Sequence, residues 1–286
     1  MGLVPNLEKE RACRLVREAA DWLREKGYRP VYPPEVDRAL FGGEGPGEVL
    51  PLNEWGEGFF CALVMGGDGT LLKAARALAG KDIPLLGVNL GRLGFLTEVE
   101  ADQLFYLLPR FLAGDYVKDR RLMLEARVIR EGRERVRFRA LNDVVVGVGP
   151  FARLALFSVQ VSGSHLGTYP ADGVIVSTPT GSTAYSLAAG GPIVDPQLGV
   201  FVITPISPHT FYARPTVISK EEVVSLRVER TDEAVVTVDG QEKEDLFRED
   251  RVEVRVAPES ACLMRRPGWD FYQVLREKMS EGYRGD

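Results

Sequence analysis

The sequence predicts an α/β domain with a parallel sheet, followed by a second domain that is mostly β. In the first third of the chain, short apolar runs alternate with segments of helical periodicity. This alternation is typical of a parallel sheet with helices on its faces. After about Tyr116, short strand-like runs separated by turn residues follow one another, which favours a β domain. A chain of 286 residues is also long enough for two domains.

The elements of the first domain are predicted from the spacing of apolar residues and from glycines that bound or end the segments. Apolar residues at helical spacing predict a helix over Glu8–Glu25, and Gly27 ends it. A glycine-bounded apolar run predicts a buried strand over Phe59–Met65. The other expected elements are a helix over Leu71–Leu78, a strand over Ile83–Asn89 closed by Gly91, a helix over Ala101–Leu112, and a flexible loop over Gly42–Pro51.

The second domain is expected to contain seven strands. Turn residues such as Glu131-Gly132 and Asp239-Gly240 separate them. We place the first domain at residues 1–116 and the second at 117–266, and expect a C-terminal helix within 267–286 to pack back on the first domain. The expected strands are Leu122–Ile129, Val136–Val148, Ala155–Val161, Gly173–Ser177, Val223–Val228, Ala234–Val238 and Val252–Val256, and the helix is Phe271–Met279.

Composition excludes several classes of function. A net charge of −5 argues against nucleic acid or an anionic membrane as the main partner, because both require a basic surface. No apolar run is long enough to span a bilayer, and the first ten residues lack the pattern of a signal peptide. The three cysteines are far apart and odd in number, which predicts reduced, buried thiols and a cytoplasmic protein.

A glycine-rich turn, Gly66-Gly67-Asp68-Gly69-Thr70, lies between a predicted strand and a predicted helix. Free N–H groups at a helix start bind anions, and glycines let the backbone approach a phosphate. A carboxylate there would repel the phosphate unless it accepts a proton or faces a bridging metal ion. The alternative is that Asp68 only caps the helix. Neither the G-x-x-x-x-G-K-[ST] loop nor a helix-opening G-x-G-x-x-G is present.

A second turn, residues 177–186, follows the strand Val174-Ile175-Val176. Seven of its ten residues carry a hydroxyl group, which suits recognition of a sugar or of phosphate oxygens. Tyr185 is available to stack on a base. The alternative is a Ser/Thr-rich loop that caps a helix.

Three further acidic positions stand out, of which the first two are candidate ligand contacts. Asp172 directly precedes the strand of the second turn and could face the same ligand. Asn142-Asp143 interrupts an apolar segment, where a polar pair needs a hydrogen-bonding partner, either a ligand or a turn. Asp239-Gly240 is interpreted as a hairpin turn, since Asp-Gly suits the type I′ conformation.

Together these segments resemble the NAD kinase family. The matching pieces are the two turns, Asn142-Asp143, Asp172-Gly173, Gly190-Gly191-Pro192 and Thr204–Thr210, in the family's order and over nearly the whole chain. The first turn alone is also similar to turns of lipid kinases and phosphofructokinases. The resemblance implies a Rossmann-like N-terminal domain, a sandwich-like C-terminal domain and transfer of a phosphoryl group from ATP or polyphosphate to the adenosine ribose 2′-hydroxyl of NAD. It also implies a homodimer or homotetramer, and a divalent cation such as Mg²⁺ bound with the donor.

The resemblance assigns roles residue by residue. Asp68 would be the catalytic base, with Gly69 and Lys73 beside it. Asn142 and Asp143 would hold the ribose or adenine of NAD. Further ligand contacts are implied for Arg153, Asp172, Thr180, Thr183, Ala184, Tyr185, Ser186, Leu187, Ala188 and Gln241, and the phosphate-binding turn comprises Gly66, Gly67, Gly69 and Thr70.

Two positions depart from the family pattern. Asp143 stands where many members have Glu, and Pro170 stands where many have a basic residue. The loss of a basic residue at Pro170 removes a phosphate contact. The competing interpretations are a lipid or sphingoid kinase, which shares the first turn but needs an acyl pocket and lacks the second turn, and a non-catalytic NAD-binding module, which would not need Asp68.

Overall fold

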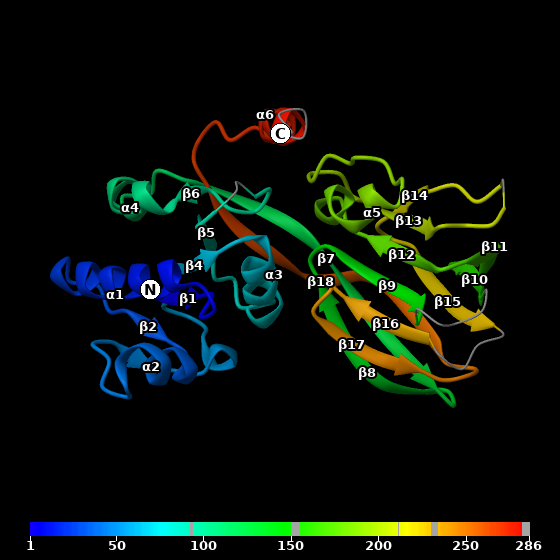
Figure 1. Ribbon diagram of the computed structural model, residues 1–286, viewed down its shortest axis with the longest axis horizontal. Coiled ribbons are helices and arrows are strands. Elements are labelled where there is room, and N and C mark those ends of the chain that lie inside the picture. The colour runs from blue at the N-terminus through cyan, green and yellow to red at the C-terminus, as the bar shows by residue number, and fades with distance from the viewer. Residues whose placement is uncertain (92–93, 150–154, 211, 230–233, 282–286) are drawn as a thin grey trace. The chain divides into compact units, whose positions relative to one another are not determined.

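In the computed structural model, Met1–Arg120 and Ala261–Asp286 form one unit built on a parallel sheet (Figure 1). All residues are described except 92–93, 150–154, 211, 230–233 and 282–286. The strands lie in the order β3–β2–β1–β4–β5, and β6 and the end of β18 also pair with β5. They are β1 (Gly2–Pro5), β2 (Val31–Tyr32), β3 (Glu48–Val49), β4 (Ala62–Gly66), β5 (Leu85–Asn89), β6 (Val99–Glu100) and β18 (Arg251–Arg265).

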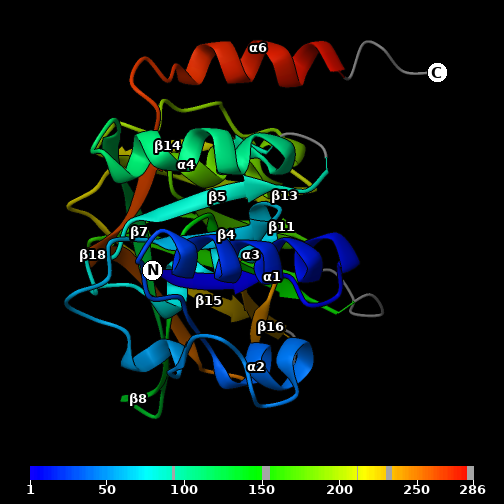
Figure 2. The ribbon, with the colours of Figure 1, turned by 90° about the vertical axis from the view of Figure 1, so that its left-hand side faces the viewer.

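Helices cover both faces of this sheet. Helices α1 (Glu10–Glu25) and α4 (Leu104–Leu112) lie on one side of the sheet (Figure 2). Their buried residues share one apolar core with alternate residues of β4 and β5. On the other face, α3 (Asp68–Ala77) packs so closely that a Cβ atom on Gly87 would lie 2.7 Å from Leu71 Cδ1. The remaining helices of the unit are α2 (Pro34–Phe41), α6 (Phe271–Glu281) and the 3₁₀ turns η1 (Leu52–Glu54) and η2 (Ala101–Gln103).

The other unit, Arg121–Ser260, is a sandwich of two mostly antiparallel sheets. Inward-facing apolar residues of both sheets form one core, with outward residues alternating between them. One sheet contains β7 (Val117–Arg130), β8 (Arg133–Ala140), β10 (Ala155–Val161), β11 (Ser164–Ala171), β15 (Val223–Glu229) and β18; the other has the order β14 (Thr216–Ser219), β13 (Val200–Ile206), β12 (Gly173–Ser177), β9 (Asp143–Val148), β16 (Ala234–Val238) and β17 (Glu242–Leu246). The short η3 (Thr180–Thr183) and α5 (Tyr185–Ala188) follow β12.

The predicted fold class is therefore confirmed, while several elements differ. The predicted strand Val136–Val148 is two strands, because β8 ends at Ala140 and β9 begins at Asp143 in the other sheet. Helix α2 was not predicted, although Pro34 at its start and left-handed Gly42 at its end are ordinary boundary signals. The prediction also missed β1, β2, β3, β6, β11, β13, β14 and β17; the charged β17 is a sheet edge, where charges are common.

The boundaries between the units lie inside strands. The chain passes from one unit to the other within β7, at Arg120–Arg121, and returns within β18, at Ser260–Ala261. Our sequence boundaries lie a few residues away, since no linker composition marks a crossing inside a strand. In α6, Phe271 is buried and its ring lies 6.4 Å from that of Phe95, whereas most of the helix is exposed. No helix in the described ranges is long and apolar enough to cross a membrane.

Candidate active site

The first glycine-rich turn connects β4 to α3. Gly66 is the last residue of β4 and Asp68 the first residue of α3, with Gly67 as the N-cap in an extended conformation. A Cβ atom on Gly66 would lie 2.2 Å from Thr70 Oγ1, so packing alone requires glycine there. A Cβ atom on Gly67 would meet nothing within 4 Å. Packing therefore gives no reason for glycine at position 67, whereas close approach of a ligand would.

The Asp68 carboxylate does not cap α3. Its Oδ2 accepts the backbone N–H of Phe95 at 2.9 Å, and its Oδ1 accepts that of Leu96 at 3.2 Å. A Cβ atom on Gly94 would lie 1.9 Å from Oδ1, so this approach requires glycine at position 94. A carboxylate has about four acceptor sites, and two bonds leave capacity for a proton or a cation. The geometry thus fixes Asp68, half-buried, in one orientation at a helix start.

A buried arginine supports the loop that holds Asp68, and the sequence analysis missed it. Arg265, fully buried at the end of β18, donates to the carbonyl oxygens of Phe95, Leu96 and Thr97 at 3.0–3.2 Å. It also pairs with Glu98 at 3.2 Å and Asp119 at 3.3 Å. The loop therefore presents its N–H groups to Asp68 and its carbonyls to Arg265.

The rest of this turn differs in exposure, since Gly66 is buried, Gly67 and Thr70 are half-buried, and Gly69 is exposed. Gly69 and Lys73 are exposed and, being four residues apart, lie on one face of α3. Within the described ranges, no three acidic, His or Cys side chains form a group that could hold a metal ion. A cation there would therefore need ligands from the phosphoryl donor as well as from the protein.

The hydroxyl groups of the second turn serve mainly its own architecture. Thr178 Oγ1 donates to the carbonyl of Leu141 at 2.6 Å, and Ser182 Oγ donates to that of Pro179 at 2.6 Å. Further bonds join Thr183 to the Thr180 carbonyl and the Ser186 hydroxyl to that of Thr204. The hydroxyl density thus reflects a tightly bonded loop more than a row of ligand contacts.

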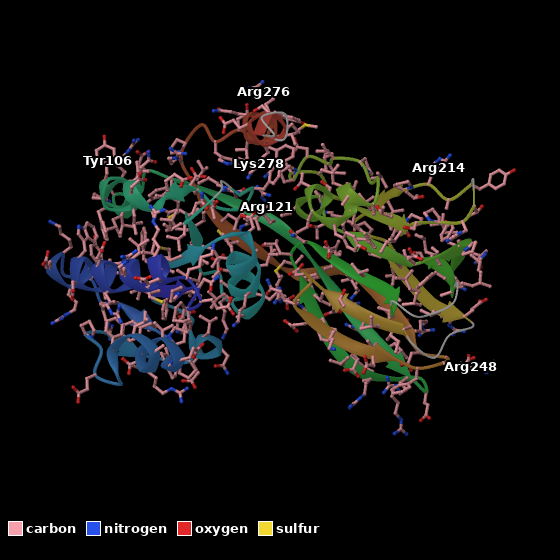
Figure 3. The ribbon with its side chains drawn as sticks, in the orientation of Figure 1. Tyr106, Arg121, Arg214, Arg248, Arg276 and Lys278 are labelled. Carbon is pink, nitrogen blue, oxygen red and sulfur yellow. The ribbon has the colours of Figure 1, made fainter. Side chains whose placement is uncertain are left out.

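The second turn contacts the Asn142-Asp143 corner, which lies in the same unit. The N–H of Thr178 donates to the Asn142 carbonyl at 2.9 Å. A Cβ atom on Gly181 would lie 2.1 Å from that same oxygen, so only glycine fits. Arg121, labelled in Figure 3, donates to Thr180 Oγ1 at 3.1 Å from β7. Its role was not predicted from the sequence.

Asp143 lies at this corner with a buried carboxyl group. The residue is 5% exposed, and no residue of the described chain donates a hydrogen bond to its carboxyl group. Burial, and secondly the nearby charge of Asp239, raise the pKa of Asp143 to about 7. At the predicted dinucleotide surface, Asp143 is therefore a carboxyl group that titrates near neutral pH.

The other predicted site residues fall in different places. Tyr185 and Leu187 on α5 are 47% and 40% exposed, Ala188 is exposed, Ala184 is half-buried and Ser186 is buried. Gln241 is exposed in the turn between β16 and β17. Asp172 precedes β12, while the second turn follows it, so about 17 Å of strand separates them within this unit. Arg153 lies outside the described residues.

Family models match both halves of the chain. Residues 1–116 match the ATP-NAD kinase N-terminal domain and residues 141–266 the ATP-NAD kinase C-terminal domain. An NAD kinase of Heliobacterium modesticaldum is 46% identical over 283 residues, which cover 99% of both chains. An NAD kinase of Caldanaerobacter subterraneus is 40% identical over 282 residues, covering 98% of this chain and 99% of the relative.

Solved structures share the fold. Yeast NADH kinase complexed with NADH gives a TM-score of 0.89 at 22% identity, covering 100% of this chain and 88% of the other. An NAD kinase from Archaeoglobus fulgidus in complex with ATP gives 0.74 at 24% identity, covering 97% of each chain. With full-length relatives at this identity and both domain models matched, the chain belongs to the NAD kinase family.

Proposed function

We propose that this protein is an NAD kinase, which transfers a phosphoryl group from ATP or polyphosphate to the 2′-hydroxyl of the adenosine ribose of NAD. The observation that carries the proposal is the Asp68 carboxylate, which the N–H groups of Phe95 and Leu96 hold at the start of α3. A carboxylate beside a phosphate-binding turn serves a kinase and would be unnecessary in a module that only binds NAD.

Asp68 is the general base in this proposal. A ribose hydroxyl is a weak nucleophile until its proton is accepted, and a positioned carboxylate accepts it as the new bond to phosphorus forms. Phosphoryl transfer passes through a loose transition state, so most of the catalysis is positioning and charge stabilisation. The N–H groups and dipole at the start of α3 would supply part of that stabilisation to the donor phosphates.

A divalent cation, Mg²⁺ in our proposal, would accompany the donor. When bound, it would supply positive charge that neutralises the charge developing on the donor phosphates. The residues of the turn are compatible with this arrangement, because Asp68 retains acceptor sites and Mg²⁺ bound to a nucleotide needs only one or two protein carboxylates. Lys73, exposed on the same helix, would add positive charge near the phosphates.

The NAD would bind to the second unit. Its contacts would come from Asn142 and Asp143, from exposed Tyr185 stacking on a base, and from backbone of the second turn. The carboxyl group of Asp143 is buried, and no described residue donates a hydrogen bond to it. This supports a ligand at this position, because such a group is costly to bury unless something bonds to it.

Assembly and compartment belong to the same proposal. We propose a homodimer or homotetramer, whose contacts could cover exposed apolar side chains such as Leu198, Tyr212 and Val217; light scattering would test this. Cys13, Cys61 and Cys262 are unpaired, which supports a reducing cytoplasm, although Cys13 is only half-buried. Burial raises the pKa of Cys61 to about 12, which keeps that thiol protonated and unreactive.

The test is a transfer assay with purified protein, Mg²⁺ and either ATP or polyphosphate, with NAD or diacylglycerol as acceptor. We expect NADP from NAD and no phosphorylated lipid. Phosphorylated diacylglycerol without NADP would support the lipid-kinase alternative. A folded protein that binds NAD but forms no product would support the non-catalytic one.

A further inference from the structure

The turn between β16 and β17 does more than reverse the chain. Asp239 and Gly240 have φ of 49° and 63°, as a type I′ turn requires of its two central residues. Such a turn depends on backbone conformation, so an Asp side chain would normally point into solvent. Asp239 is instead only 8% exposed. Its side chain therefore has a role that the hairpin does not explain.

The Asp239 carboxylate holds the corner between β8 and β9. Its Oδ1 accepts the N–H groups of Asn142 at 2.8 Å and Asp143 at 3.2 Å, and its Oδ2 accepts that of Leu141 at 3.1 Å. The Asp239 N–H also donates to the Asp143 carbonyl at 3.0 Å. The chain passes from one sheet to the other here, and buried N–H groups at such a crossing must find acceptors outside the strand ladders.

In the described part of the chain, no side chain near Asp143 donates a hydrogen bond to its carboxyl group. Ser177 is the cross-strand partner of Asp143 on β12, so their side chains share a face, and the Ser177 hydroxyl is fully buried with no hydrogen-bond partner in the described chain. Val144 and Val238 pair beside it and carry no charge. Among the described residues, Asp239 is the charged group that acts on Asp143, and Arg121 of β7 donates to Thr180.

We propose that Asp239 is the positioning residue of the dinucleotide site: its carboxylate fixes the 141–143 corner so that Asn142 and Asp143 meet the ligand, and its charge couples NAD binding to release of a proton from Asp143. The coupling rests on the proposed function, since it takes NAD as the ligand. On binding, the O–H bond of the Asp143 acid breaks, the proton passes to solvent, and the resulting carboxylate accepts hydrogen bonds from ribose hydroxyl groups.

NAD affinity should decrease as the pH falls below 7. In the free protein the pKa of Asp143 is about 7, and bonds from hydroxyl donors lower it in the complex. Below pH 7, binding must displace the proton, so NAD affinity falls by up to tenfold per pH unit. Above about pH 8 the carboxyl is already ionised, and affinity is independent of pH.

The experiment is calorimetric titration of the full chain with NAD at pH 6 and pH 8.5, in two buffers of different ionisation enthalpy. We expect nearly one proton released per NAD at pH 6 and almost none at pH 8.5. Asp239→Asn keeps one acceptor oxygen but loses the charge. It should weaken NAD binding about tenfold at pH 8.5, leave kcat within about twofold, and move proton release to lower pH, because removing the like charge lowers the pKa of Asp143.

Asp250→Asn is the matched control. Asp250 is also a buried turn carboxylate in this unit, accepting the Phe247 N–H at 2.9 Å and pairing with Arg130. A purely structural role for Asp239 would make the two variants alike, with lower stability but unchanged NAD affinity and proton release. That result would overturn the proposal.

Asp143→Asn tests the coupling between NAD binding and proton release even if Asp239→Asn does not fold, because the amide of Asn cannot release a proton. Proton release that persists at pH 6 in Asp143→Asn would also overturn the proposal. If NADP forms but binding releases no proton, this inference fails and the proposed function stands. If NAD binds with proton release but no NADP forms, the proposed function fails and this inference stands.

Discussion

Replacing Asp68 with Asn tests the proposed base. Asn keeps the shape of the side chain and one acceptor oxygen, but its amide group cannot take a proton. The structure adds a second consequence, because the two carboxylate oxygens accept the N–H groups of Phe95 and Leu96. In Asp68→Asn one of these donors would face an NH₂ group and lose its acceptor. The variant therefore changes both the chemistry and the loop.

The two effects differ in size. Loss of a general base costs about 10²–10⁴-fold in rate. An N–H group left without an acceptor costs about 1 kcal/mol at a half-buried site, the lower end of the usual range. That corresponds to a fall in melting temperature of about 2–4 °C, small enough for the protein to remain folded at 25 °C. A loss of rate above a hundredfold would thus exceed what the loop alone explains.

Thr97→Val is the matched control for the loop. Thr97 Oγ1 accepts the N–H of Gly94 at 3.2 Å, so Val removes one acceptor from the same loop and leaves Asp68 intact. We would measure kcat, KM for NAD and thermal unfolding for both variants. We expect similar stability losses, with kcat lowered at least a hundredfold only in Asp68→Asn. If Asp68→Asn keeps more than a tenth of the wild-type rate, or if Thr97→Val loses as much, Asp68 is not the base.

Three further predictions follow from the geometry of the two turns. Gly67→Ala should unfold at the wild-type temperature, because its Cβ meets nothing within 4 Å, yet raise KM for ATP about tenfold by obstructing the phosphate; an unchanged KM would contradict the phosphate site. Gly94→Ala should lower kcat about a hundredfold by displacing Asp68, while Gly91→Ala, with open space around its Cβ, should not; equal losses would refute the steric argument. Tyr185→Ala should raise KM for NAD about tenfold and Tyr185→Phe should not, because stacking needs only the ring; a similar change in KM for ATP would mean that Tyr185 does not serve NAD.

The fold class was predictable because its signals are local. The strand predicted over Phe59–Met65 and the helix after it appear as β4 and α3. A short apolar run and helical spacing of apolar residues are local patterns that predict such elements. Strands such as β1 and β2, of four and two residues, were missed because so short a run gives no period. The break between β8 and β9 depends on a change of sheet, which no local pattern encodes.

The ligand roles of the two turns stay predictions. Gly66–Thr70 and the second turn were identified as candidate sites from composition and position. Arg265 and Asp239 were not, because each acts on residues more than ninety positions away. For Arg265, the only sequence signal was its position directly after the apolar residue Met264. For Asp239, it was the Asp239-Gly240 pair, which a hairpin turn already explained.

In each unit, one carboxylate accepts hydrogen bonds from successive backbone N–H groups. Asp68 and Asp239 differ in solvent exposure, and the proposed roles of the two side chains differ accordingly. Asp68 orders the loop at Phe95 and remains half-buried, so a ligand hydroxyl can still reach it. Asp239 orders the corner at Asn142 and is 8% exposed, so it acts only through the residues it holds. A base must touch the reacting hydroxyl, whereas a positioning group need not. The same substitution, Asp to Asn, should therefore lower kcat at position 68 and weaken NAD binding at position 239.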